Sequence, residues 1–72
     1  MTDLTPEEQD NVRAALRFLR TRTGAWGTLA KALRFKYVTV QKAATGNTVS
    51  ASMAVRVARL ADAPVSDVLS GR

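Results

Sequence analysis

The stretch LRFKYVTVQKAATG, residues 33–46, decides the fold because its composition favours two different secondary structures. The segment YVTV consists of β-branched and aromatic residues, which favour strands. A lone strand needs a partner, however, and no other segment alternates polar and apolar residues over a useful length. A helix over residues 37–45 would instead group three small or apolar residues on one side: Val40, Ala43 and Ala44. We therefore predict a short helix that ends at Gly46, with tertiary packing overriding local propensity.

The remainder of the chain predicts helices separated by short connections. Thr5 can cap a helix that begins at Pro6, and Glu8 completes a capping box. An apolar stripe follows at helical spacing, and the helix is expected to end near Thr23-Gly24. A second helix begins near Trp26, which we expect to lie in the core.

The C-terminal third predicts two more helices. Either Thr48 or Ser50 can open the first of them, in which Met53, Val57 and Leu60 form the inner stripe. The Ala63-Pro64 pair ends that helix, and residues 65–69 form a last short helical turn. Together these segments predict an all-α domain without a sheet.

Length and composition are those of one small domain. A chain of 72 residues, treated as a single domain over residues 1–72, buries only ~60% of its unfolded surface. It contains no cysteine and no histidine, so neither disulfides nor thiolate metal sites support the fold. No segment reaches the ~20 apolar residues of a membrane span, and the N-terminus lacks a signal-peptide pattern. We expect a cytoplasmic protein held together by packing.

Charge is distributed unevenly along the chain, whose formal net charge is +5. The six acids lie near the ends: Asp3, Glu7, Glu8, Asp10, Asp62 and Asp67. Residues 11–61 carry ten basic residues and no acid. An ordinary solvated surface mixes the two signs, so an unbroken basic span indicates an anionic partner. Nucleic acid fits this signal best, and an anionic membrane surface is the weaker alternative.

Two segments resemble a known family. The stretch LAKALRFKYVTVQKAATGN, residues 29–47, resembles the lambda-repressor-like (Cro/XRE-type) helix-turn-helix, with a Leu-Ala pair in the first helix and Phe35 inside the turn. The stretch SMAVRVARLADAPVSDVLSG, residues 52–71, is similar to the fourth and fifth helices of that family. The likeness covers roughly residues 12–71.

This resemblance implies a compact five-helix domain with its helix-turn-helix core at about residues 25–46. In the family, the second helix of the pair enters the DNA major groove. Carried over by position, the implied base-contact candidates are Tyr37, Val38, Gln41, Lys42 and Thr45. The phosphate-contact candidates are Arg17, Arg20, Arg34 and Lys36. The implied partner is double-stranded DNA, bound by a homodimer of a small transcriptional regulator associated with the nucleoid.

Four positions depart from the family pattern. Arg34 occupies a turn position usually given to glycine, so either it adopts that geometry at a cost or the turn differs. Lys36 stands where Ser or Thr usually caps the recognition helix. Trp26 replaces a common polar residue, which puts one backbone contact in doubt, and Ala44 replaces a frequent glutamate.

Several features have more than one interpretation. The stripe of Arg13, Arg17 and Arg20 fits a solvated face as well as a phosphate contact. Phe18 is expected to pack under the last helix, with a dimer interface as the alternative. The other dimer-contact candidates are Val55 and residues 65–69. Gln41 and Lys42 are either ordinary surface or base-reading residues, and their acid-free surroundings favour the second.

The same residues make catalysis unexpected. Without histidine or cysteine, and with the acids confined to the ends, no nucleophile has a base and no carboxylates have metal-ligand spacing. We expect no cofactor, metal or small-molecule substrate. Sequence-specific DNA binding is the favoured function. The alternative is a protein-interaction module, because helix-turn-helix domains also bind partner proteins, as in antitoxins.

Overall fold

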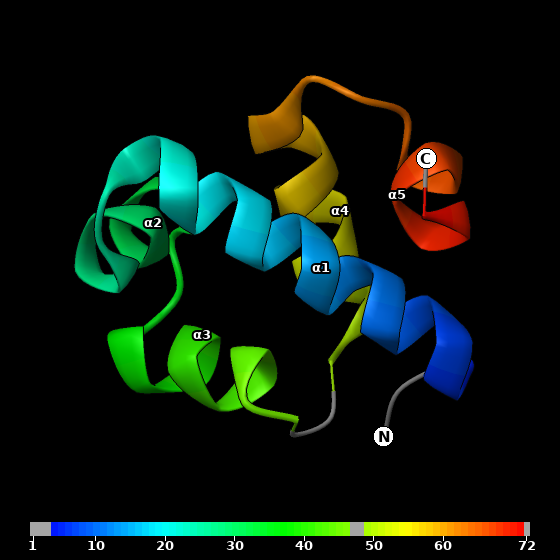
Figure 1. Ribbon diagram of the computed structural model, residues 1–72, viewed down its shortest axis with the longest axis horizontal. Helices are drawn as coiled ribbons and strands as arrows, with labels where there is room; N and C mark the ends of the chain where they lie inside the picture. Colours follow the sequence, from blue (N-terminus) through cyan, green and yellow to red (C-terminus); the bar gives the residue numbers. More distant parts are fainter. Residues whose placement is uncertain (1–3, 47–48, 72) are drawn as a thin grey trace.

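The computed structural model describes residues 4–46 and 49–71, and within them it contains five α-helices and no strand (Figure 1). The helices are α1 (Pro6–Thr23), α2 (Trp26–Leu33), α3 (Tyr37–Ala44), α4 (Ala51–Ala61) and α5 (Val65–Ser70). The expected all-α, five-helix architecture is therefore confirmed. None of the helices in the described part of the chain is long and apolar enough to cross a membrane.

Residues 37–44 form a helix despite their strand-like composition. Val40, Ala43 and Ala44 are buried, at 0%, 2% and 6% exposure, and α3 packs against both α2 and α1. Burial of this side stabilises the helix more than the low helix propensity of Val and Thr opposes it. The helix ends one residue earlier than expected. Thr45 is its C-cap, and Gly46 follows with a left-handed φ of 115°.

The predicted helix starts and stops are present at the described positions. The capping box is complete, because Glu8 N donates to Thr5 Oγ1 (3.1 Å) and Thr5 N donates to Glu8 Oε1 (2.9 Å). Gly24 ends α1 with a φ of 88°. Ser50 opens α4 by accepting a hydrogen bond from Met53 N (3.2 Å), whereas its alternative, Thr48, lies outside the described residues.

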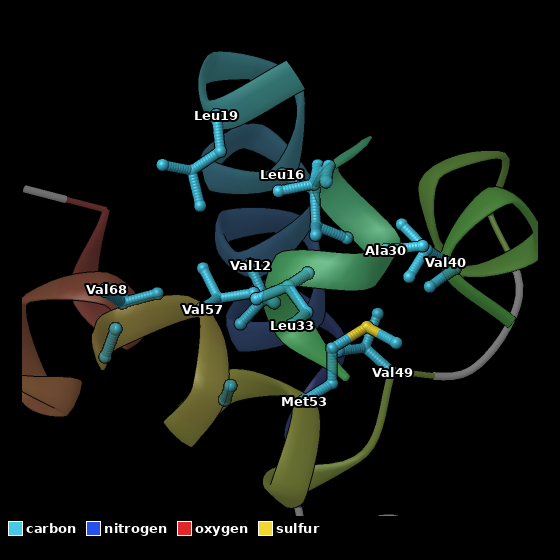
Figure 2. Close-up of a cluster of buried hydrophobic side chains, with 14 residues drawn as sticks. Val12, Leu16, Leu19, Ala30, Leu33, Val40, Val49, Met53, Val57 and Val68 are labelled. Carbon is cyan, nitrogen blue, oxygen red and sulfur yellow. The ribbon is translucent and has the colours of Figure 1, made fainter. Parts of the chain in front are cut away.

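A single hydrophobic core holds the helices together (Figure 2). All five helices and the segment before α4 contribute to it; the largest buried side chains are Leu16, Leu19, Leu29, Leu33, Val12, Val40, Val49 and Val57. No buried residue within the described ranges is polar or charged. Trp26 and Phe35 are only partly buried and pack against the edge of the core, so Trp26 is less central than expected.

Arg34 adopts the geometry that the turn between α2 and α3 requires. Its φ and ψ are 61° and 36°, in the left-handed region, and it serves as the C-cap of α2. This conformation costs an ordinary L-residue roughly 1–2 kcal/mol. Asp62 adopts the same conformation at the end of α4, with a φ of 58°. Of the two alternatives for Arg34, the structure has the first: the residue adopts the left-handed conformation that glycine would favour, at a cost in strain.

Replacing Arg34 with glycine should stabilise the fold. The Arg34→Gly variant removes the left-handed strain from the folded state, but it also increases the conformational entropy of the unfolded chain. The free energy of unfolding should rise by about 0.5–1 kcal/mol in total. Asp62→Gly should gain less, because Asp tolerates this conformation better. Urea unfolding of the three proteins measures both changes. A loss of stability in Arg34→Gly would show that the side chain contributes more to folding than its backbone costs.

Candidate nucleic-acid interface

The outer side of α3, together with its C-cap Thr45, presents all five base-contact candidates to solvent. At about 100° per residue, Tyr37, Gln41, Thr45, Val38 and Lys42 fall within one arc of roughly 140°. Tyr37 and Val38 are 46% and 52% exposed, and the other three are exposed as well. The opposite arc holds the buried residues of the helix. The spacing in the sequence therefore correctly predicted that these side chains lie on the exposed side of the helix.

The helices α2 and α3 begin without a side-chain cap. Lys36 at the start of α3 and Ala25 at the start of α2 accept no capping hydrogen bond, and neither helix has an acid in its first turn. By contrast, Thr5 and Ser50 cap α1 and α4. The free backbone N–H groups and the positive end of each helix dipole favour an anion nearby.

Two arginines of α1 bind the C-terminal end of α3. Arg13 donates from Nε to Ala43 O (3.0 Å) and from Nη2 to Gly46 O (3.1 Å), and its Nη1 forms a salt bridge with Asp10 Oδ1 (2.6 Å). Its side chain is only 12% exposed. Arg17 donates from Nη2 to Ala44 O (3.3 Å). The sequence suggested either a solvated face or a phosphate contact for these arginines. Neither interpretation included a role as a C-terminal cap of another helix.

A third arginine holds the turn between α2 and α3. Arg56 of α4 donates from Nη1 to Leu33 O (3.3 Å) and Arg34 O (3.1 Å). Its guanidinium carbon lies 4.5 Å from the centroid of the Phe35 ring, which is a cation–π distance. Arg56 lies outside the inner stripe that the sequence predicts for its helix, and the sequence gives no partner for its side chain. A cation suits a helix C-terminus, but nothing in the sequence indicates which helix it will reach.

The remaining phosphate-contact candidates are exposed. Arg20 lies with its guanidinium carbon 6.0 Å from the Trp26 ring centroid, at the limit of a cation–π contact. Arg34 and Lys36 flank Phe35 at the two ends of the turn. Across residues 4–46 and 49–71, the Arg13–Asp10 pair is the one salt bridge present. Most of the basic charge is therefore not neutralised within the described structure.

Phe18 does not pack under the last helix, so that expectation is wrong. Its side chain is 59% exposed, and the guanidinium carbon of Arg22 lies 5.8 Å from its ring centroid. It borders a hollow of about 380 Å³ between α1, α5 and the end of α4. Four of the eight residues that line the hollow are alanines: Ala14, Ala15, Ala61 and Ala63. The small side chains of these alanines leave the space beside the ring open.

The described residues contain no group of three His, Cys, Asp or Glu side chains that could hold a metal ion. Comparisons with family models, curated proteins and solved structures find no match to this chain. The likeness to the lambda-repressor-like family therefore depends on the residues quoted above and stays a prediction.

Removing the Arg13 cap should destabilise the fold. In Arg13→Ala, the carbonyls of Ala43 and Gly46 lose a charged partner, at a cost of about 1–3 kcal/mol. Arg20→Ala is the matched control, because Arg20 is exposed and its loss should change stability by less than about 0.5 kcal/mol. Urea denaturation of both variants measures the difference. Equal losses in the two variants would remove the capping role from Arg13.

Proposed function

We propose that this protein is a sequence-specific double-stranded DNA-binding protein, a small transcriptional regulator with a lambda-repressor-like domain that inserts α3 into the major groove. The observation that carries the proposal is the pair α2 and α3. The two helices are joined by residues 34–36, and the second exposes an acid-free side. Two helices, a three-residue connection and an exposed side on the second helix support the proposal, because such an insertion requires all three.

The dimensions and chemistry of α3 fit a major groove. Its eight residues span about 12 Å, and the groove is about 12 Å wide. Gln41 can donate to and accept from adenine, Lys42 can donate to guanine, and Val38 can contact a thymine methyl group. Tyr37 and Thr45 lie at opposite ends of the same side. The Thr45 hydroxyl donates to Lys42 O (3.0 Å), so towards a base its oxygen acts as an acceptor.

Four cations are proposed to contact phosphates: Arg17, Arg20, Arg34 and Lys36. Lys36 lies at the N-terminus of α3, where a cation is unfavourable for the isolated helix and a phosphate would offset that cost. Within the described residues, Arg17 donates a hydrogen bond from only one of its guanidinium nitrogens, Nη2, to Ala44 O. Its guanidinium carries five N–H donors, so it can hold the helix end and a phosphate together.

DNA binding is proposed to involve two copies of the chain. One short recognition helix buries too little surface to select a genomic site, and two-fold partners place their helices about one DNA turn apart. The exposed Phe18 is the strongest candidate for the contact between copies. Val55, Val65 and Leu69 are half-buried and are the other candidates.

A protein-interaction module is the second candidate function. The observation that favours it is the exposed Phe18 ring beside the alanine-lined hollow, which is an apolar surface away from the α3 side. In that case the partner would be a protein, as it is for antitoxins, and the chain would bind duplex DNA only weakly or not at all.

The Gln41→Ala variant tests base reading. A preferred duplex is first selected from a random-sequence pool, and affinities for it and for its scrambled version are then measured by fluorescence anisotropy. Gln41→Ala should cost about 1–3 kcal/mol on the preferred duplex and almost nothing on the scrambled one. Thr28→Ala, at an exposed position of α2, serves as the control. Equal losses on both duplexes would exclude Gln41 from base reading, and failure to select any duplex would favour the protein-interaction module.

The Lys36→Ala variant tests phosphate contact. It should weaken binding to all duplexes alike and reduce the salt slope, d log K/d log[salt], by about one unit. The same change should leave folding stability unaltered or slightly raised, since it removes a cation from the N-terminus of α3. Affinities at four salt concentrations and a urea titration give both quantities. An unchanged salt slope would show that Lys36 does not contact phosphate.

A further inference from the structure

An open groove of about 500 Å³ lies between the C-terminal end of α2 and the outer side of α4. Three of the six residues that line it are arginines; the full set is Ala32, Leu33, Arg34, Arg56, Arg59 and Leu60. No acid lines the groove. We call this site the arginine groove. Its three cations are not on the exposed side of α3, so base reading does not account for them.

Arg34 is strained where glycine would not be. Its left-handed φ of 61° is costly for an L-residue, and its side chain donates no hydrogen bond to the residues that the structure describes. The Arg34 guanidinium therefore makes no hydrogen bond with the described residues that would offset the backbone strain. Strained residues of this kind concentrate where a side chain serves binding. The position of Arg34 on the groove gives its guanidinium a use.

Arg56 supplies a guanidinium that is already held in place. Its Nη1 is bonded to the carbonyls of Leu33 and Arg34, and its guanidinium carbon lies 4.5 Å from the centroid of the Phe35 ring. Its Nε and Nη2 atoms donate no hydrogen bond within the described ranges. Less conformational entropy is lost when such a fixed group binds a ligand. Arg56 is therefore the preorganised member of the three.

Arg59 lies three residues further along α4, on the same side as Arg56. It is exposed, and it forms no salt bridge with Asp62 or any other acid in residues 4–46 and 49–71. Three guanidinium groups with no carboxylate among them repel one another. A bound anion would remove that repulsion, so the groove has an electrostatic preference for a multiply charged anion.

We propose that the arginine groove binds a phosphate group. The planar fork of a guanidinium matches two phosphate oxygens, and two or three forks can surround one phosphate. The volume is in the range of small-ligand sites, and Leu33 and Leu60 add an apolar wall, so a phosphate ester fits as well as inorganic phosphate. The phosphate belongs either to a small phosphorylated molecule or to a DNA backbone. The proposal does not require α3 to read bases.

A titration of the full chain with inorganic phosphate tests the proposal. Binding is monitored by ¹H–¹⁵N NMR of the backbone amides and the arginine Nε–H groups. Chloride at matched ionic strength is the reference. Saturable shifts should cluster at residues 32–34 and 56–60. Arg59→Ala should weaken phosphate binding at least fivefold, while Arg22→Ala, an exposed arginine outside the groove, should change it less than twofold. Shifts spread over all basic residues, or equal effects of the two variants, would overturn the proposal.

Arg34→Gly separates binding from folding. Because it relieves backbone strain, it should keep or raise the thermal midpoint while weakening phosphate binding at least threefold. Unchanged phosphate affinity in this folded variant would remove Arg34 from the site. An unfolded Arg34→Gly protein would contradict the strain argument itself and with it the case for the groove.

A duplex titration identifies the source of the phosphate. If the DNA backbone supplies it, a duplex should move the same groove resonances, compete with inorganic phosphate, and lose about one unit of salt slope in Arg59→Ala. If a small molecule supplies it, inorganic phosphate should stay bound in the presence of duplex, and Arg59→Ala should leave duplex binding unchanged. Both results support the groove as a phosphate site. Phosphate binding without any duplex binding would leave the groove in place and refute only the proposed DNA function.

Discussion

The hydrogen bonds from guanidinium groups to helix-end carbonyls are the contacts on which the geometry of α2 and α3 depends. Each of these helices has only eight residues, a length that is marginal for an isolated helix in water. Neither has a side-chain cap at its N-terminus. Arg13 and Arg17 close the C-terminal end of α3, and Arg56 closes that of α2. Cations at these ends also interact favourably with the helix dipoles.

These contacts show that the basic residues of the acid-free span, residues 11–61, do not all serve an anionic partner alone. Three of the ten basic residues between positions 11 and 61 bind backbone carbonyls of the fold itself. Arg17 and Arg56 keep other guanidinium N–H groups for a partner. The basic residues without such a backbone bond lie mainly around the turn and on the outer sides of α2, α3 and α4.

Local signals predicted most of the fold. The Thr5–Glu8 capping box, Gly24 and Ser50 act on neighbours within a few residues, so their sequence alone indicates their structure. The buried side of α3 followed from spacing once a strand had no partner. The roles of Arg13 and Arg56 could not be predicted in this way, because the bonded atoms are 30 and 22–23 residues apart in sequence. The exposure of Phe18 likewise depends on how α5 lies against α1. The alanines beside the ring come from segments that are far apart in the sequence, so the sequence alone does not show that they meet.

The α1 helix connects these observations. At about 100° per residue, Arg13, Arg17 and Arg20 lie on one side of its buried stripe, while Asn11, Ala15 and Phe18 lie on the other. The first side holds α3. On the second, Asn11 donates from Nδ2 to Leu69 O (2.7 Å) and so holds α5, beside the hollow that Phe18 borders. If two copies meet at Phe18 as proposed, α1 carries the contact between copies and also holds α3 in each copy. The separation of the two α3 helices would then be set by the fold of each chain, with no flexible linker between them.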